Sequence, residues 1–219
     1  MSNHAPLVRR SFLSRLTVGA AAFGAALTGG AVLPSVARAA GTGNEGGHPE
    51  DAWFDGMKGM HKVVYDCTSA ESGHSGWFFA KNFLTANASG YNMKDTDCAV
   101  VVSLRHFATF YAYNDAMWAK YPLAEMGKID DPTTKARAKR NTHSTEAKDL
   151  AARGVVLSVC GMATQFFAGE IAKQMNVKAE DVNKELAANL VVSQAHMMAA
   201  GVVAVSRAQE HGFSYTYVG

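Results

Sequence analysis

The chain has 219 residues, enough for one domain with a full hydrophobic core. Hydrophobic residues make up 48% and charged residues 18% of it, a composition that excludes wholesale disorder. The formal net charge is only +2, and three cysteines are too few for a scaffold held together by disulfides.

The positive excess lies in the first 39 residues, which contain four arginines and no acidic residue. The rest of the chain therefore has 17 basic against 19 acidic residues. Nucleic-acid-binding domains typically carry a basic excess, so we expect no nucleic-acid partner.

Residues 1–39 have the pattern of an export signal. Arg9 and Arg10 precede Phe12 and Leu13, an uncharged Ala- and Gly-rich run follows, and residues 37–39 have the A-x-A form of a cleavage site. This order resembles a twin-arginine signal peptide, which implies export of a folded protein to the periplasm. An uncleaved membrane anchor is the alternative, because the run is long enough to span a bilayer. After cleavage we expect no membrane contact.

Residues 40–56 are rich in Gly and polar side chains and predict a flexible linker before a domain at 57–219. In that domain, β-branched runs alternate with segments of helical period. We expect helices at about 77–89, 107–120, 144–153, 163–174, 179–188 and 195–211. The expected strands are 61–66, 98–104, 155–159, 190–192 and 213–218, with a polar insertion at about 122–144.

Five strands joined by helical connections predict an α/β fold with a parallel sheet and helices on both faces. In such sheets, ligands bind at the carboxyl ends of the strands. Cys67 follows the first strand and Cys160 ends the third, so both are expected at this edge. Cys98 begins the second strand, about 20 Å away at about 3.3 Å per residue, and is interpreted as a small buried hydrophobe.

Cys160 is the strongest candidate for chemistry. Gly161 follows it and a helix is expected to begin shortly afterwards, so the thiol would lie near free backbone N–H groups and the positive end of a helix dipole. That environment lowers the pKa of a thiol and favours the nucleophilic thiolate. A cysteine that only packs at the end of a strand is the alternative.

Two further polar residues are expected at the same edge. Arg105 and His106 follow the second strand, where a guanidinium and an imidazole suit anion binding, thiolate stabilisation or proton transfer. His74, in an expected loop at residues 73–76, could also reach this edge. Each of these residues also has a purely structural interpretation.

Three segments of the chain resemble one protein family. Residues 154–163 are similar to the strand–cysteine–helix segment of DsrE/DsrF-like sulfur-relay proteins, residues 208–217 to the end of that family, and residues 61–66 to its first strand. The resemblance covers about residues 58–218. It implies a flavodoxin-like three-layer fold with a five-stranded parallel sheet, homo-oligomers, and a persulfide carried by Cys160 with a sulfur-donor or acceptor protein as partner.

The resemblance also implies the strand order 2-1-3-4-5, in which the first and third strands are neighbours. Cys67 and Cys160 could then approach disulfide distance as a redox pair or a structural link. The insertion follows the second strand, and its basic residues Lys135, Arg137, Lys139 and Arg140 could form a lid over the site. A solvated charged loop is the alternative for this segment.

Other chemistries find less support in the sequence. Met57, Met60 and His61, and the run His196-Met197-Met198, are soft ligands that suit Cu(I), although methionine is also a common core residue. No zinc-site spacing, nucleotide-binding glycine pattern or Gly-x-Ser-x-Gly motif occurs, and we expect no cofactor. The sequence thus favours sulfur or thiol redox chemistry at Cys160, assisted by Arg105, His106 and Cys67. A non-enzymatic module that binds a small ligand or a subunit is the alternative.

Overall fold

The computed structural model describes residues 48–219, so the expected signal peptide and residues 40–47 of the linker lie outside the described residues. Residues 49–56, expected as the end of that linker, instead form a 3-10 helix and a short α-helix because Phe54 is fully buried.

The strands are β1 (His61–Cys67), β2 (Cys98–Leu104), β3 (Val156–Cys160), β4 (Ala195–Met198) and β5 (Ser214–Tyr217). The α-helices are α1 (Ala52–Gly56), α2 (Ala70–Tyr91), α3 (Asp115–Lys120), α4 (Leu123–Gly127), α5 (Ser144–Ala152), α6 (Gly161–Met175), α7 (Ala179–Ala188) and α8 (Gly201–Glu210). The 3-10 helices are η2 (Pro49–Asp51), η3 (Asp95–Asp97) and η4 (His106–Ala112).

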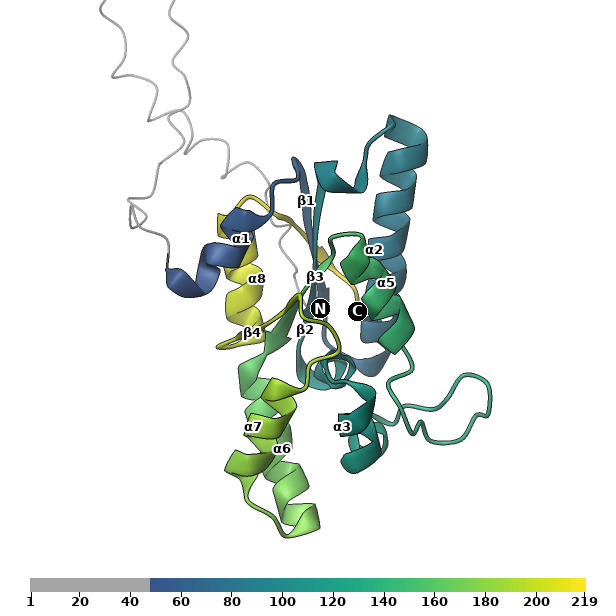
Figure 1. The fold of residues 1–219 in the computed structure, drawn as a ribbon, viewed down its shortest axis with the longest axis vertical. Helices are drawn as coiled ribbons and strands as arrows, with labels where there is room; N and C mark the ends of the chain where they lie inside the picture. The colour runs from purple at the N-terminus through teal and green to yellow at the C-terminus, as the bar shows by residue number, and fades with distance from the viewer. Residues whose placement is uncertain (1–47) are drawn as a thin grey trace, which may run out of the picture. The chain divides into compact units, whose positions relative to one another are not determined.

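The five strands form one parallel sheet with helices on both faces, which confirms the predicted three-layer α/β fold. Figure 1 shows α1 and α8 on one side of the sheet and α2 and α5 on the other. The core divides in the same way. Alternate residues of β1, such as Val63 and Val64, pack in two different apolar clusters, one under α2, α5 and α6 and one under α1 and α8.

The strand order is β4-β3-β2-β1-β5, so the order 2-1-3-4-5 implied by the resemblance is wrong. Strand β2 lies at the centre and pairs with both β1 and β3. The physical reason lies in its composition, because the central strand of a parallel sheet is covered on both faces and β2 has no charged residue. The two edge strands, β4 and β5, are shorter and more exposed.

The chain from β3 to β4 also differs from expectation. Residues 195–198, predicted as the start of a long helix, form β4 and pair with β3 from Leu157 to Cys160. The expected strand at 190–192 is limited to an isolated bridge between Leu190 and Tyr113. A short apolar run fits a buried strand as well as a helix, and pairing with β3 decides between them.

Two predicted segments change character next to the carboxyl edge. The expected helix at 107–120 is divided into η4 and α3, because the Asn114 side chain accepts a hydrogen bond from the N–H of Met117 and caps a new helix there. Residues 73–76, expected as a loop, belong to α2, which begins earlier than predicted at a capping box formed by Ser69 and Ser72.

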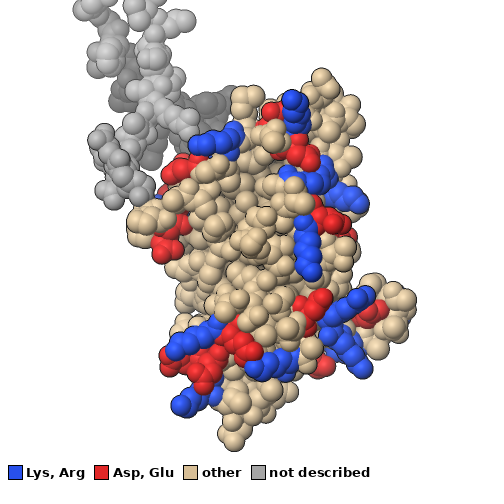
Figure 2. All heavy atoms as spheres, viewed as in Figure 1, with Lys and Arg blue, Asp and Glu red and all other residues tan. Residues whose placement is uncertain are grey.

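Charged side chains on the surface are largely mixed in sign. On the face shown in Figure 2, basic side chains lie beside acidic ones. Exposed ion pairs include Lys120 with Glu185 and Arg137 with Asp130. Within residues 48–219, no helix combines the length and the apolar character needed to cross a membrane.

Candidate functional site

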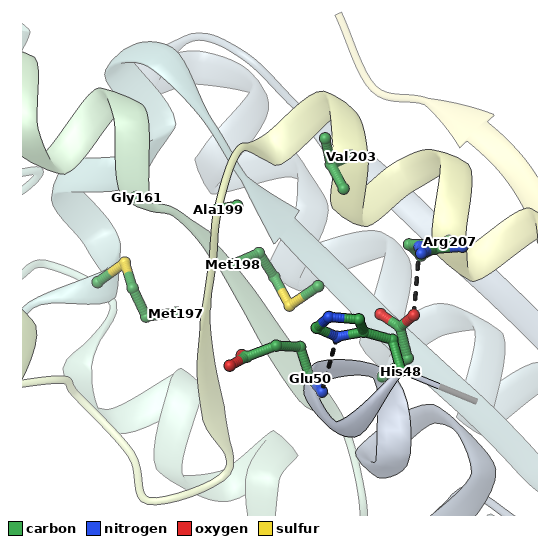
Figure 3. Close-up of a pocket in the computed structure, with 9 residues that line it drawn as sticks. His48, Glu50, Gly161, Met197, Met198, Ala199, Val203 and Arg207 are labelled. Atoms are coloured by element: carbon green, nitrogen blue, oxygen red, sulfur yellow. Dashed lines mark hydrogen bonds and ion pairs between the residues drawn. The ribbon is translucent and has the colours of Figure 1, made fainter. Parts of the chain in front are cut away.

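The carboxyl edge of the sheet has one point where neighbouring strands send their connections to opposite faces. Strand β3 continues into α6, whose buried residues belong to the same apolar cluster as those of α2 and α5, whereas β4 leads to α8, whose buried residues belong to the other cluster. Ligands of open α/β proteins bind at such points. A pocket of about 480 Å³ opens beside the ends of β3 and β4 (Figure 3). Its lining includes Gly161 after β3, Met198 at the end of β4, Ala199 after it, and Val203 and Arg207 of α8.

Cys160 lies at this point as the last residue of β3. Its Sγ accepts a hydrogen bond from the backbone N–H of Ala163 at 3.3 Å, so the thiol itself caps the 15-residue helix α6. The start of α8 is close as well, since a Cβ placed on Gly201 would lie 3.2 Å from the Cβ of Cys160. Two helix amino termini therefore meet near this sulfur, and both favour negative charge.

Arg105, the residue that follows β2, forms an ion pair with Asp66. Arg105 lies beside Cys160, because a Cβ on Gly201 would also lie 2.5 Å from the Cβ of Arg105. Its guanidinium, however, makes two hydrogen bonds to Asp66, with Nε–Oδ1 at 2.6 Å and Nη2–Oδ2 at 2.8 Å. Tyr215 of β5 donates a third hydrogen bond to Asp66 at 2.9 Å. The guanidinium is thus held in a largely buried ion pair that ties β1, β2 and β5 together.

The structure separates the two cysteines that were expected to pair. Cys67 is fully buried against α2 at the end of β1, and β2 lies between β1 and β3. Both Cys67 and Cys160 are free thiols. Burial, with a smaller contribution from Asp66, raises the pKa of Cys67 far above its ordinary value. The proposed proximity of Cys67 and Cys160 was wrong because it depended on the wrong strand order.

The remaining predicted residues lie at opposite ends of β2. His106 is exposed directly after Arg105 and adopts a left-handed backbone conformation with φ 49°. Cys98 begins β2 at the amino edge of the sheet and is partly buried, not wholly buried as expected. Burial and the neighbouring Asp95 and Asp97 carboxylates raise the pKa of the Cys98 thiol.

The soft side chains considered for Cu(I) are dispersed. Figure 3 shows Met197 and Met198 pointing to opposite sides of β4. The ring of His196 stacks on Trp53, with ring centroids 4.6 Å apart, and Met60 is 82% exposed at the amino edge. In the part of the chain that the structure describes, no group of three or more His, Cys, Asp or Glu side chains is arranged to hold a metal ion.

A second group of titratable side chains lies between α2 and α5, and of its members the sequence indicated only His74. His74 Nδ1 lies 3.0 Å from Nε2 of the buried His143, whose Nδ1 contacts a carboxylate oxygen of Glu146. His143 immediately precedes α5 and Glu146 lies in its first turn. The sequence signal in this region is Ser144, which predicts the start of a helix. It does not show that the preceding residue, His143, faces α2.

The expected lid contributes to this second group and not to the pocket beside Cys160. Its Ile129 and Ala138 are buried in the core, and the Asn141 side chain donates hydrogen bonds to the backbone carbonyls of Tyr111 and Tyr113 at 2.9 and 2.8 Å. Arg137 is paired with Asp130. The segment is thus an anchored connection that lines a pocket with His74.

His143 is expected to make the protein less stable in mild acid. Its pKa is lowered, chiefly by burial, with His74 acting in the same direction and Glu146 opposing. The unfolded chain therefore binds a proton at His143 first, and stability present above pH about 7 is lost as the pH falls below about 6.5, by at most about 1.4 kcal/mol per pH unit. Urea unfolding of wild type and His143→Gln at about pH 7.5 and 5.5 measures this. Equal losses of stability in the two proteins would contradict it.

A scan against protein-family models finds no match, and a search of curated proteins finds no relative.

Proposed function

We propose that the protein performs sulfur-transfer or thiol redox chemistry through Cys160, as its resemblance to DsrE/DsrF-like proteins implies. The observation that carries the proposal is the hydrogen bond from the N–H of Ala163 to the Cys160 sulfur at the amino terminus of α6. A thiolate in this position gains from the N–H donor and from the helix dipole. Neither Cys67 nor Cys98 has such support, and the pKa of each is raised.

The proposed step moves one sulfane sulfur. The Cys160 thiolate attacks the terminal sulfur of a persulfide donor, the S–S bond of the donor breaks, and a new S–S bond forms on Cys160. The transferred sulfur carries its hydrogen with it, so Cys160 becomes a persulfide and the donor leaves as a thiolate; transfer of that proton to the leaving thiolate then gives a donor thiol and a persulfide anion on Cys160. His106 is exposed at the same edge and is the candidate for moving that proton. Arg105, whose guanidinium is held by Asp66, acts as a positioning residue beside Cys160.

The first test compares the thiols in the folded protein. With an alkylating reagent near neutral pH, we expect Cys160 to react before Cys98, although Cys98 is the more exposed of the two. With inorganic polysulfide, we expect the intact protein to gain the mass of one sulfur atom. This gain is expected to be lost in Cys160→Ser and kept in the matched control Cys98→Ser.

Reaction of Cys98 before Cys160, or sulfur uptake by Cys160→Ser, would refute the proposal. It would favour instead a non-enzymatic module that binds a small ligand, for which the pocket of about 480 Å³ beside β4 is the supporting observation.

The mass of the intact protein also reports the first residue of the exported chain. The paired arginines and the A-x-A sequence support export to the periplasm and a mature chain that begins at Ala40.

A further inference from the structure

A chain of three titratable side chains links α5 to α2 on the face of the sheet opposite α8. The carboxylate of Glu146 contacts Nδ1 of His143, and Nε2 of His143 lies 3.0 Å from Nδ1 of His74. The two imidazole rings are tilted by 50°, with centroids 4.8 Å apart. Their contact therefore joins two ring nitrogens and is not a stacking contact.

The hydrogen bonds determine where the protons of the two rings lie. A carboxylate only accepts, so Nδ1 of His143 carries a hydrogen, and Nε2 of a neutral His143 is then an acceptor. His74 must donate from its own Nδ1. Its Nε2 is left with a free lone pair, which is the arrangement of a base whose second nitrogen is held by a carboxylate-linked partner.

We call the chain Glu146–His143–His74 the relay. Its middle residue, His143, is fixed in position by its neighbours. His143 is 7% exposed, and its backbone N–H donates a hydrogen bond to the side chain of Asn141 at 2.9 Å. The ring of Tyr111 packs against it edge-on, with centroids 5.0 Å apart. Tyr111 in turn fits against α2 only because residue 73 is glycine, since a Cβ there would lie 2.5 Å from its ring.

The outer residue of the relay opens on a pocket. His74 is exposed and lines a space of about 350 Å³ between α2 and the segment that follows α4. The charged residues that line the same pocket are Glu71, Lys128 and Asp130, and the polar ones are Tyr111 and Thr142. Asp130 is paired with Arg137. His74 and Lys128 thus line one small, partly apolar pocket together with two carboxylate residues.

We propose that this pocket is a second catalytic site, in which Nε2 of His74 is the general base for hydrolysis of a small carbonyl ester. Nε2 takes a proton from a water molecule while the water oxygen forms a bond to the carbonyl carbon. The C–O bond to the alcohol then breaks, and His74 returns the proton to the departing oxygen. Lys128 provides positive charge for the oxyanion, and the imidazolium charge on His74 is shared through His143 with Glu146. The proposal does not depend on Cys160.

Hydrolysis of p-nitrophenyl acetate provides the probe. All proteins in this experiment carry Cys160→Ser, so that acylation of that thiol does not contribute. We expect His74→Gln to lower the rate by at least about tenfold. We expect His143→Gln and Glu146→Gln to lower it less, and His61→Gln, which removes an exposed imidazole at the other end of β1, to leave it unchanged.

A spectroscopic measurement keeps the proposal testable if a variant folds poorly. Long-range ¹H–¹⁵N correlation spectra of the folded chain report which ring nitrogen of each histidine carries hydrogen. The relay requires hydrogen on Nδ1 of both His74 and His143. A His74 with its hydrogen on Nε2, or a parent protein that hydrolyses the ester no faster than His74→Gln, overturns the proposal.

Discussion

Replacing Asp66 with alanine is expected to lower the free energy of unfolding by about 3–5 kcal/mol. Asp66 is 1% exposed and accepts both hydrogen bonds of the Arg105 guanidinium, whose side chain is itself only 18% exposed. Without the carboxylate, a mostly buried cation keeps its desolvation cost and loses its counter-charge. The hydroxyl of Tyr215 loses its acceptor at the same time.

Denaturant unfolding of matched variants measures this effect. Tyr215→Phe removes only one hydrogen bond to the same carboxylate and is expected to cost about 1–2 kcal/mol. Replacing both charges, as Asp66→Leu with Arg105→Met, is expected to cost less than Asp66→Ala alone, because no unpaired charge remains. An Asp66→Ala protein within about 1 kcal/mol of wild type would show that solvent, and not Asp66, stabilises Arg105.

Adding one methyl group at Gly76 is expected to destabilise the protein by about 2 kcal/mol, although alanine is the better helix former. Gly76 lies in α2 where the helix crosses β1, and a Cβ there would lie 2.4 Å from the sulfur of Cys67. Cys67 is fully buried, so either the helix or the strand must shift. The steric cost exceeds the gain in helix propensity.

A double-mutant cycle identifies the cause. Cys67→Ala alone is expected to cost about 1 kcal/mol for the small cavity it leaves. Combined with Gly76→Ala, it removes the clashing atom, so the double variant is expected to be more stable than the sum of the single effects. Gly90→Ala is the control in the same helix, because nothing lies within 4 Å of its Cβ position, and we expect it to be neutral or stabilising. Additive costs at residues 67 and 76 would contradict the steric explanation.

The sequence predicted the elements of this fold better than their arrangement. β2 and α7 have the predicted bounds, and β1, β3 and α5 lie within about one residue of theirs. The order of the strands was taken from a family resemblance, although β2, with no charge over Cys98–Leu104, has the composition of a central strand. β4 was missed because the strand, Ala195–Met198, is only four residues long and runs almost directly into α8.

The sequence predicted individual residues of the candidate site but not the contacts between their side chains. Cys160 lies at the strand end and helix start where it was expected. The partner of Arg105 is Asp66, the last residue of the first predicted strand. This pairing was not predicted because a contact across 39 positions leaves no local pattern in the sequence. The contact between His74 and His143 spans 69 positions and depends on how the connection before α5 folds back.

The separation of the three thiols has a consequence for the chemistry proposed at Cys160. Cys67 lies beyond a central strand under α2, and Cys98 lies at the far end of that strand. Neither is placed to resolve a bond formed on Cys160. If Cys160 takes up sulfur as proposed, its persulfide would have to be released by a thiol from another molecule, and discharge would depend on the encounter with that acceptor.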